Sequence, residues 1–228
     1  LNAGATDDEL ALSLTGNTID GNSSSAVLFA AYFSGNDVYN ITMVDNEMID
    51  SNLYGITLYS STSSVGRVTV SGNSISNTGI NLGEAALTVT TEDDARLDMR
   101  VSGNLISNIW GDGIVGVAGE NSELNMTVDN NRLLNKQRFL NEPLIELRAG
   151  GGPGDTSTGR FHVYDNVVDN NVNPGITFLQ TAGTQAWCVD PLQTGSNAIN
   201  PANISATNNG TPVNVTGTIT DIDSIPTP

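Results

Sequence analysis

The ten residues Val68-Thr-Val-Ser-Gly-Asn-Ser-Ile-Ser-Asn77 recur almost unchanged as Met99-Arg-Val-Ser-Gly-Asn-Leu-Ile-Ser-Asn108. Looser copies of this pattern are spread over the rest of the 228-residue chain, and each has an Asn where the pattern turns. These asparagines are Asn17, Asn46, Asn73, Asn104, Asn131, Asn166 and Asn209. Successive members lie between 27 and 43 residues apart, within the range of roughly 20–50 residues that is typical of stacked structural repeats.

Before each of these asparagines, apolar and polar residues alternate, as in Val68/Val70 and Met99/Val101. A period of two is typical of a β-strand with one buried face. A shorter apolar stretch follows each turn and a third stretch comes later in the repeat, so each repeat predicts three strands. Such strands, laid turn upon turn, predict an all-β parallel β-helix (β-solenoid) of about seven rungs.

The seven asparagines are interpreted as a structural ladder. Asn tolerates the left-handed backbone region that a sharp bend needs, and its side chain bonds nearby backbone groups. Stacked side-chain amides also bond one another from turn to turn. Each bond contributes about 0.5–1.5 kcal/mol, whereas a buried amide without a partner costs more. We therefore expect the asparagines to stabilise the fold and not to bind a ligand.

This three-strand repeat with its turn Asn resembles the right-handed parallel β-helix of the pectin-lyase-like superfamily, over about residues 10–209. We expect a β-helix domain over residues 1–209 and a strand or linker tail over residues 210–228. The resemblance says little about activity, because this fold hosts lyases, glycosidases, phage spikes and adhesins.

The composition limits the possible partners. The formal net charge is −17, with a single His. Binding to nucleic acid or to an anionic membrane surface requires a basic patch, so neither is expected as a partner. No run of about 18 apolar residues is present, so no membrane span is expected. The only cysteine, Cys188, cannot form an intramolecular disulfide. An acidic, Asn- and Thr-rich chain that begins at Leu1 is expected to be processed and extracellular or at the cell surface.

One candidate metal site lies in two turns that are one repeat apart. The acidic residues of these turns are Glu92, Asp93, Asp94, Glu120 and Glu123. Parallel strands lie about 4.8 Å apart, so these carboxylates are expected to be neighbours. Several converging oxygens suit Ca²⁺, which takes six to eight oxygen ligands. The alternative is an ordinary solvated acidic turn whose side chains point apart.

A candidate lyase site lies in and after the loop at residues 135–143. Its members are Lys136, Arg138, Glu142 and Glu146, with Lys136 or Arg138 as the base that removes a proton beside a uronate. The alternative is a polar loop with local ion pairs that contribute less than about 1 kcal/mol. A chain of charge −17 also repels a uronate polymer unless cations bridge the two.

Six Asn-X-Ser/Thr triplets are possible glycosylation sites in an extracellular chain. Their asparagines are Asn22, Asn40, Asn125, Asn203, Asn209 and Asn214. The alternative is chance, because strands rich in Asn and Thr produce this triplet often.

The two ends of a solenoid decide the function that we expect. Each end exposes a strand layer that must be capped, continued or paired with another molecule. The sequence shows no amphipathic cap helix, which favours a non-catalytic structural protein that assembles head to tail into a fibre. Its expected partners are copies of itself or neighbouring surface-protein segments. The alternatives are a polysaccharide-active enzyme and a glycan-binding adhesin.

Overall fold

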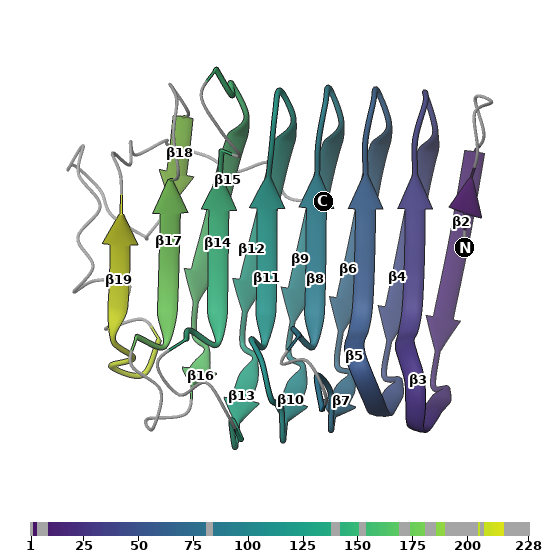
Figure 1. Cartoon of the computed structure of the whole chain (residues 1–228), viewed down its shortest axis with the longest axis vertical. Coiled ribbons are helices and arrows are strands. Elements are labelled where there is room, and N and C mark those ends of the chain that lie inside the picture. Colours follow the sequence, from purple (N-terminus) through teal and green to yellow (C-terminus); the bar gives the residue numbers. More distant parts are fainter. Residues whose placement is uncertain are drawn as a thin grey trace.

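The structure is a computed structural model that describes residues 2–3, 9–80, 84–137, 142–150, 154–168, 174–180, 186–189, 205 and 208–216. Within these ranges the chain winds into a parallel β-solenoid, whose turns lie side by side from the β2 end to the β19 end (Figure 1). The predicted fold class is therefore confirmed. About five turns are complete, fewer than the seven predicted, because the strands at the two ends are short or only half-covered.

One wall of the solenoid is a seven-stranded parallel sheet. In spatial order its strands are β18 (Ala186–Val189), β15 (Thr158–Tyr164), β12 (Glu123–Asp129), β9 (Arg96–Ser102), β6 (Val65–Ser71), β4 (Val38–Val44) and β2 (Glu9–Thr15). These strands carry the repeated alternation, and their pairing aligns equivalent residues of successive repeats. Val68, for example, lies between Ile41 and Met99.

The remaining strands form a twelve-stranded parallel sheet that wraps around the other side. The short strands after the turn Asn are β7 (Ser74–Ser76), β10 (Leu105–Ser107), β13 (Arg132–Leu134) and β16 (Val167–Val168). The longer strands are β8 (Leu87–Thr91), β11 (Ile114–Ala118), β14 (Ile145–Ala149), β17 (Ile176–Gln180) and β19 (Val213–Thr216). In the first two turns, one long strand takes the place of both the short strand and the longer strand: β3 (Thr18–Phe33) in the first turn and β5 (Glu47–Ser60) in the second. β1 (Asn2–Ala3) pairs with the end of β3.

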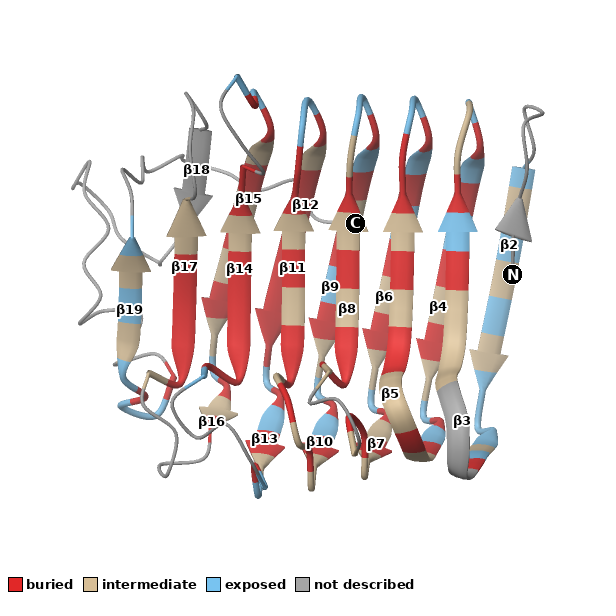
Figure 2. Cartoon of the chain, in the orientation of Figure 1, coloured by how far each residue is buried: buried red, intermediate tan, exposed pale blue. Residues whose placement is uncertain are grey.

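The inward side chains form one continuous apolar core. Because side chains alternate along a strand, every second residue faces inward, and register stacks these residues in columns. Ile41, Val68, Met99, Met126 and Phe161 form one such column, and each has an exposed fraction of 0%. Burying a side chain of this size contributes about 1.5–3 kcal/mol. Figure 2 shows this buried interior running through the middle turns, with less cover at β2 and β19.

The predicted Asn ladder is present in every turn that the structure describes. In each step the backbone N–H and the Nδ2 group of one Asn both donate to the Oδ1 atom of the next, at 2.9 Å and 2.9 Å from Asn46 to Asn73. The second Nδ2 hydrogen is donated to a backbone carbonyl one turn earlier, as from Asn46 to Leu14 O at 2.9 Å. The residue before each of these asparagines has a positive φ: Gly16, Asp45, Gly72, Gly103, Asn130 and Asp165.

The last member of the ladder is Asn208 and not Asn209, which corrects the prediction. Asn166 donates to Asn208 Oδ1 from its backbone N–H and from Nδ2, at 3.1 Å and 2.8 Å. Asn209 and Gly210, which follow this ladder Asn, have positive φ values. The described part of the predicted tail, β19, pairs in parallel with β17 and continues the solenoid.

Candidate functional site

Among the candidate lyase residues, Lys136 lies at the centre of a buried cluster of polar contacts. Its Nζ atom donates to the backbone carbonyls of Glu142 and Pro143, both at 3.0 Å, and lies 3.3 Å from Asp112 Oδ1. The Lys136 side chain is 0% exposed and that of Asp112 is 19% exposed. Burial lowers the pKa of Lys136, although Asp112 opposes the change. Burial raises the pKa of Asp112 to about 6, although Lys136 opposes that change.

The other lyase candidates are only partly brought together. Glu142 contributes its carbonyl, and its side chain lies on the exposed surface. Glu146 lies on β14 and pairs with Arg148 two residues later. Arg138 lies outside the described residues. Asp112, which sequence reasoning missed, is the carboxylate that Lys136 contacts. This geometry fastens the segment after β13 to the chain before β14. It also covers the ammonium that a base would have to present to a substrate.

The acidic turns form a cluster, the acidic corner, made of Glu92, Asp93, Asp94 and Glu120, in which Glu92 is half-buried and the other three are exposed. Asp93 and Glu120 both have φ near 55°, and their turns stack. The hydroxyl of Tyr59 donates to Glu92 and the backbone N–H of Thr62 donates to Asp93. A side-chain hydrogen bond with Asp93 and the charge of that carboxylate raise the pKa of Glu120.

Glu123 lies apart from the acidic corner. It points outward from β12 and forms ion pairs with Arg96, at 2.9 Å, and with Arg160. Within the described ranges, no group of three or more His, Cys, Asp or Glu side chains is arranged to hold a metal ion. The Ca²⁺ site therefore stays a prediction, without Glu123 as a convergent ligand.

The asparagines of the predicted glycosylation sites differ in their exposure. Asn40, Asn209 and Asn214 are exposed. Asn125 is buried at 3% exposure, and its Nδ2 atom donates to Asp98 Oδ1 at 2.7 Å. Attachment of a glycan to Asn125 has to break this contact. Asn203 and the side chain of Asn22 lie outside the described part of the chain.

The outer face of the seven-stranded sheet carries a network of ion pairs. Arg100 makes a two-point contact with Asp129, through Nε at 3.2 Å and Nη2 at 3.1 Å. Ser102 and Asn130 also donate to Asp129, whose side chain is completely covered. Burial opposes ionisation of Asp129, but the donors Arg100, Asn130 and Ser102 outweigh it and lower the pKa of this carboxyl. Two-point contacts of this kind are among the strong hydrogen bonds of proteins.

We compared the chain with protein families, curated proteins and solved structures. No family model, no curated protein and no solved structure matches this chain. The parallel β-solenoid is therefore the level at which the fold is established. No helix in the described residues has the length and apolar character needed to cross a membrane.

Proposed function

We propose that this protein is a non-catalytic structural module of an extracellular or cell-surface layer, and that its solenoid ends associate head to tail with further copies. The observation that carries the proposal is one column of inward side chains in the twelve-stranded sheet. Its members, in register, are Phe29, Ile56, Leu87, Ile114, Ile145, Ile176 and Val213. The five inner members are 0% exposed, whereas Phe29 and Val213, at the two ends, are only half-buried.

A second copy placed in line sets its Phe29 beside Val213 of the first and continues this column. The N-terminal end offers further half-buried side chains, Leu10, Leu12 and Leu14, at positions whose equivalents in the next turn are buried. β1 already pairs with the edge of β3 at Tyr32 and Phe33. The joint is therefore expected to use the inward columns that precede these two residues along β3.

The energetics favour a joint that depends on concentration. Complete burial of one such side chain contributes about 1.5–3 kcal/mol, and the smaller part of that cover is still to be gained at each of these positions. Association of two proteins costs about 4–15 kcal/mol in lost freedom of motion. Gain and cost are of similar size, so filaments are expected at high protein concentration and not at high dilution.

The Asn ladder gives the rod a direction, because each Asn donates toward the C-terminal end. At that end the backbone N–H of Asn208 donates to Ser205 O, within its own turn. The proposed joint therefore rests on the strand edges and the apolar columns, and not on a continued ladder. A contact between unlike ends propagates without closing on itself.

Electron microscopy with charged end variants tests the joint. Leu12→Lys places a charge in the N-terminal end and Val215→Lys in the C-terminal end; Ser13→Lys and Asn214→Lys, on the exposed side of the same strands, are the matched controls. We expect filaments from the wild type and both controls, and single rods about 34 Å long from each end variant. A mixture of the two end variants is expected to form dimers and no filaments. Discrete wild-type rods at every concentration contradict the proposal.

Kinship with the pectin-lyase-like superfamily is a further part of the proposal. It is supported by the period of the repeat and the stacked Asn ladder alone. The extracellular or cell-surface location is supported by composition, and antibody labelling of intact cells of the source organism tests it.

A further inference from the structure

Lys136 and Asp112 place an amine and a carboxyl group in contact, away from water. Nζ of Lys136 lies 3.3 Å from Oδ1 of Asp112, and the first side chain is completely covered and the second largely covered. Lys136 is the only lysine of the chain, so this is the one place where an acidic side chain can meet a lysine amine. An amine and a carboxyl group are the two reactants of an amide bond.

The backbone that carries this pair is fixed by hydrogen bonds between turns. Asp112 lies between β10 and β11, and its carbonyl oxygen accepts the backbone N–H of Ala86 at 2.9 Å. Lys136 follows β13, and the backbone N–H of the next residue, Gln137, donates to Ile109 O at 2.7 Å. Two reactants held in contact in this way reach effective concentrations of about 10⁵–10⁸ M when they are well oriented.

The surroundings favour the uncharged forms of both groups. Burial lowers the pKa of Lys136 and raises the pKa of Asp112 to about 6, although the attraction between the two groups opposes both shifts. The charges of Glu146 and Glu142 also raise the pKa of Asp112, and they oppose the shift of Lys136. An amine reacts through a free electron pair and a carboxyl group reacts in its protonated form. Transfer of one proton from Lys136 to Asp112 therefore prepares both reactants.

We propose that Lys136 and Asp112 are joined by an isopeptide bond that the folded protein forms by itself. The new bond links Nζ of Lys136 to the carboxyl carbon Cγ of Asp112. The bond from this carbon to one carboxyl oxygen breaks, and that oxygen leaves as water with the carboxyl proton and one proton of the amine. The reaction needs no oxidant, cofactor or second substrate, and it does not depend on the end-to-end association proposed above.

Glu146 is the carboxylate that moves the proton from the nitrogen to the departing oxygen. It lies on β14, and its charge acts on both Lys136 and Asp112. Its side chain is largely covered and is held in place by Arg148. The charge of Glu142 acts on the same two groups, but this residue is exposed.

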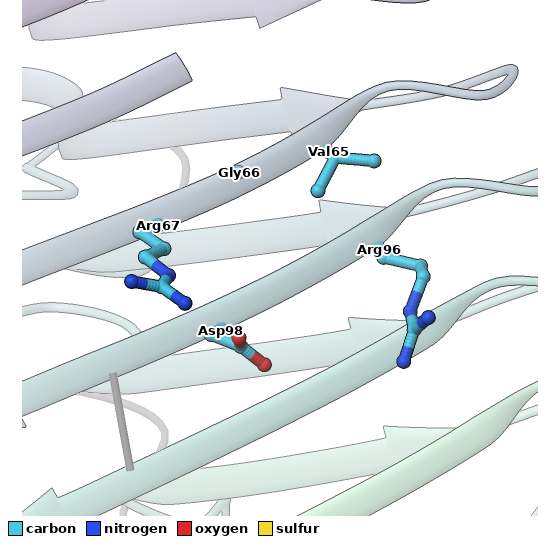
Figure 3. A pocket seen from close by; sticks show the side chains of 5 residues that line it. All are labelled: Val65, Gly66, Arg67, Arg96 and Asp98. Carbon is cyan, nitrogen blue, oxygen red and sulfur yellow. The ribbon is translucent and has the colours of Figure 1, made fainter. Parts of the chain in front are cut away.

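The other ion pairs among the described residues lack these features. All of them use arginine, whose guanidinium stays protonated and has no electron pair for an attack. Their arginine side chains are also partly exposed to water. Figure 3 shows such an open region, the hollow at strands β6 and β9, with Arg67, Arg96 and Asp98 around it. An amide bond between side chains is therefore not expected at these pairs.

The bond joins two neighbouring turns of the solenoid through their side chains. Lys136 and Asp112 are 24 residues apart, so the bond closes a loop of the chain. A cross-link of this kind stabilises a protein chiefly by limiting the freedom of the unfolded chain. We expect the linked protein to melt about 5–10 °C above a variant that cannot form the bond.

The mass of the purified full chain, measured after denaturation, tests the proposal. We expect the wild type to be lighter than its sequence by one water. Lys136→Arg, which keeps the charge and hydrogen-bond donors but has no reactive amine, is expected to have the full sequence mass. Proteolysis of the wild type is expected to give a branched peptide that joins the segments of Lys136 and Asp112. A wild-type chain of full mass after prolonged incubation of the folded protein overturns the proposal.

A second route to the loss of water is separated in the same experiment. Asp112 precedes Gly113, and an Asp–Gly pair also loses water when the Gly nitrogen closes a succinimide ring. In the structure the backbone N–H of Gly113 instead donates to Leu144 O at 2.9 Å. Hydroxylamine opens a succinimide and leaves an isopeptide bond intact. A loss of water that hydroxylamine reverses, or that persists in Lys136→Arg, overturns the assignment to these two side chains.

Glu146→Gln tests the proton carrier, and Glu142→Gln, at the exposed acid beside the same pair, is the matched control. The rate of water loss is followed by mass spectrometry after cell-free synthesis of the full chain. We expect Glu142→Gln to react like the wild type and Glu146→Gln to react at least about 100-fold more slowly. Equal rates in the two variants overturn the role of Glu146.

Discussion

At the ends of the five inner strands of the seven-stranded sheet, β4, β6, β9, β12 and β15, the chain turns on a buried Asn, whereas at the start of each of these strands it turns on a residue that varies. The residues just before β4, β6, β9, β12 and β15 are Asp37, Ser64, Ala95, Ser122 and Ser157, and all are buried. The two corners have the same spacing and the same burial, and only one of them repeats a single residue type.

The partners of the hydrogen bonds explain this difference. Each inner ladder Asn accepts from the Asn of the preceding turn, donates to the Asn of the next turn and donates to a backbone carbonyl of the preceding turn, as Asn73 does. It therefore needs an acceptor and two donor hydrogens on one short side chain. Ser64 donates to a backbone carbonyl of its own turn, Ser61 O at 2.8 Å. Ser122 donates to Gly119 O in its own turn at 2.7 Å and to Thr91 O in the preceding turn at 2.9 Å. The ladder Asn bonds the side chain of an identical residue in the adjoining turns, which fixes the residue type. The serine hydroxyls donate to backbone carbonyls, which every residue type provides, so this position can vary.

Asn104→Ala is the change with the largest expected effect. It removes the acceptor of the backbone N–H and Nδ2 groups of Asn73, and it removes the donor to Val70 O. Each buried polar group left without a partner costs about 1–3 kcal/mol, so we expect a loss of about 3–5 kcal/mol in the free energy of unfolding. Urea unfolding followed by far-UV circular dichroism measures it. A loss below about 1 kcal/mol contradicts a ladder that links the turns.

Ser122→Ala tests the opposite corner in the same assay. The substitution removes the bonds to Gly119 O and Thr91 O and the contact with Thr91 Oγ1. We expect a loss of only about 1 kcal/mol, because the Gly119 and Thr91 carbonyls keep the backbone N–H groups of Ser122 and Gly119 as donors, and Ala95 fills the equivalent position one turn earlier. A loss as large as that of Asn104→Ala removes the distinction between the two corners.

Ala95→Ser is expected to be neutral or to stabilise the protein by up to about 1 kcal/mol. Ala95 is 0% exposed and its backbone N–H donates to Glu92 O, in the arrangement that Ser122 has with Gly119. The new hydroxyl is therefore expected to bond the Glu92 carbonyl. Thermal unfolding of the variant checks the sign, and a destabilised variant shows that the position lacks room for one oxygen.

Glu120→Gln has the smallest expected effect, and only this one depends on pH. The hydrogen bond and charge of Asp93 raise the pKa of Glu120 in the folded protein. Such a group favours the folded state below its unfolded pKa, and this contribution is lost as pH rises through the folded pKa. The variant is therefore expected to raise the melting temperature by at most about 2 °C at pH 7. At pH 3.5 no gain is expected, and equal gains at both pH values contradict the sign.

The fold could be predicted because its two signals are local and repeated. Alternation identifies a strand without any distant partner, and seven copies identify the stacking. The ladder was predicted at six of its seven positions. The seventh failed because the sequence offers Asn208 and Asn209 together, and only backbone conformation decides which one carries the ladder bonds.

The candidate sites could be predicted less well, because they depend on which side chains meet across turns. Lys136 was noticed as the only lysine, but Asp112 lies 24 residues earlier, which is not a repeat spacing. Glu123 was grouped with the acidic corner from its place in the chain, yet the outward direction at the start of β12 brings it to two arginines.

The ladder also determines how the molecule responds to force. Hydrogen bonds between turns run along the axis of the rod, so tension applied to its two ends loads each turn in series. Successive ladder residues are 29, 27, 31, 27, 35 and 42 residues apart. Each turn that peels away therefore releases a separate length of chain, and we expect the protein to lengthen in steps under tension.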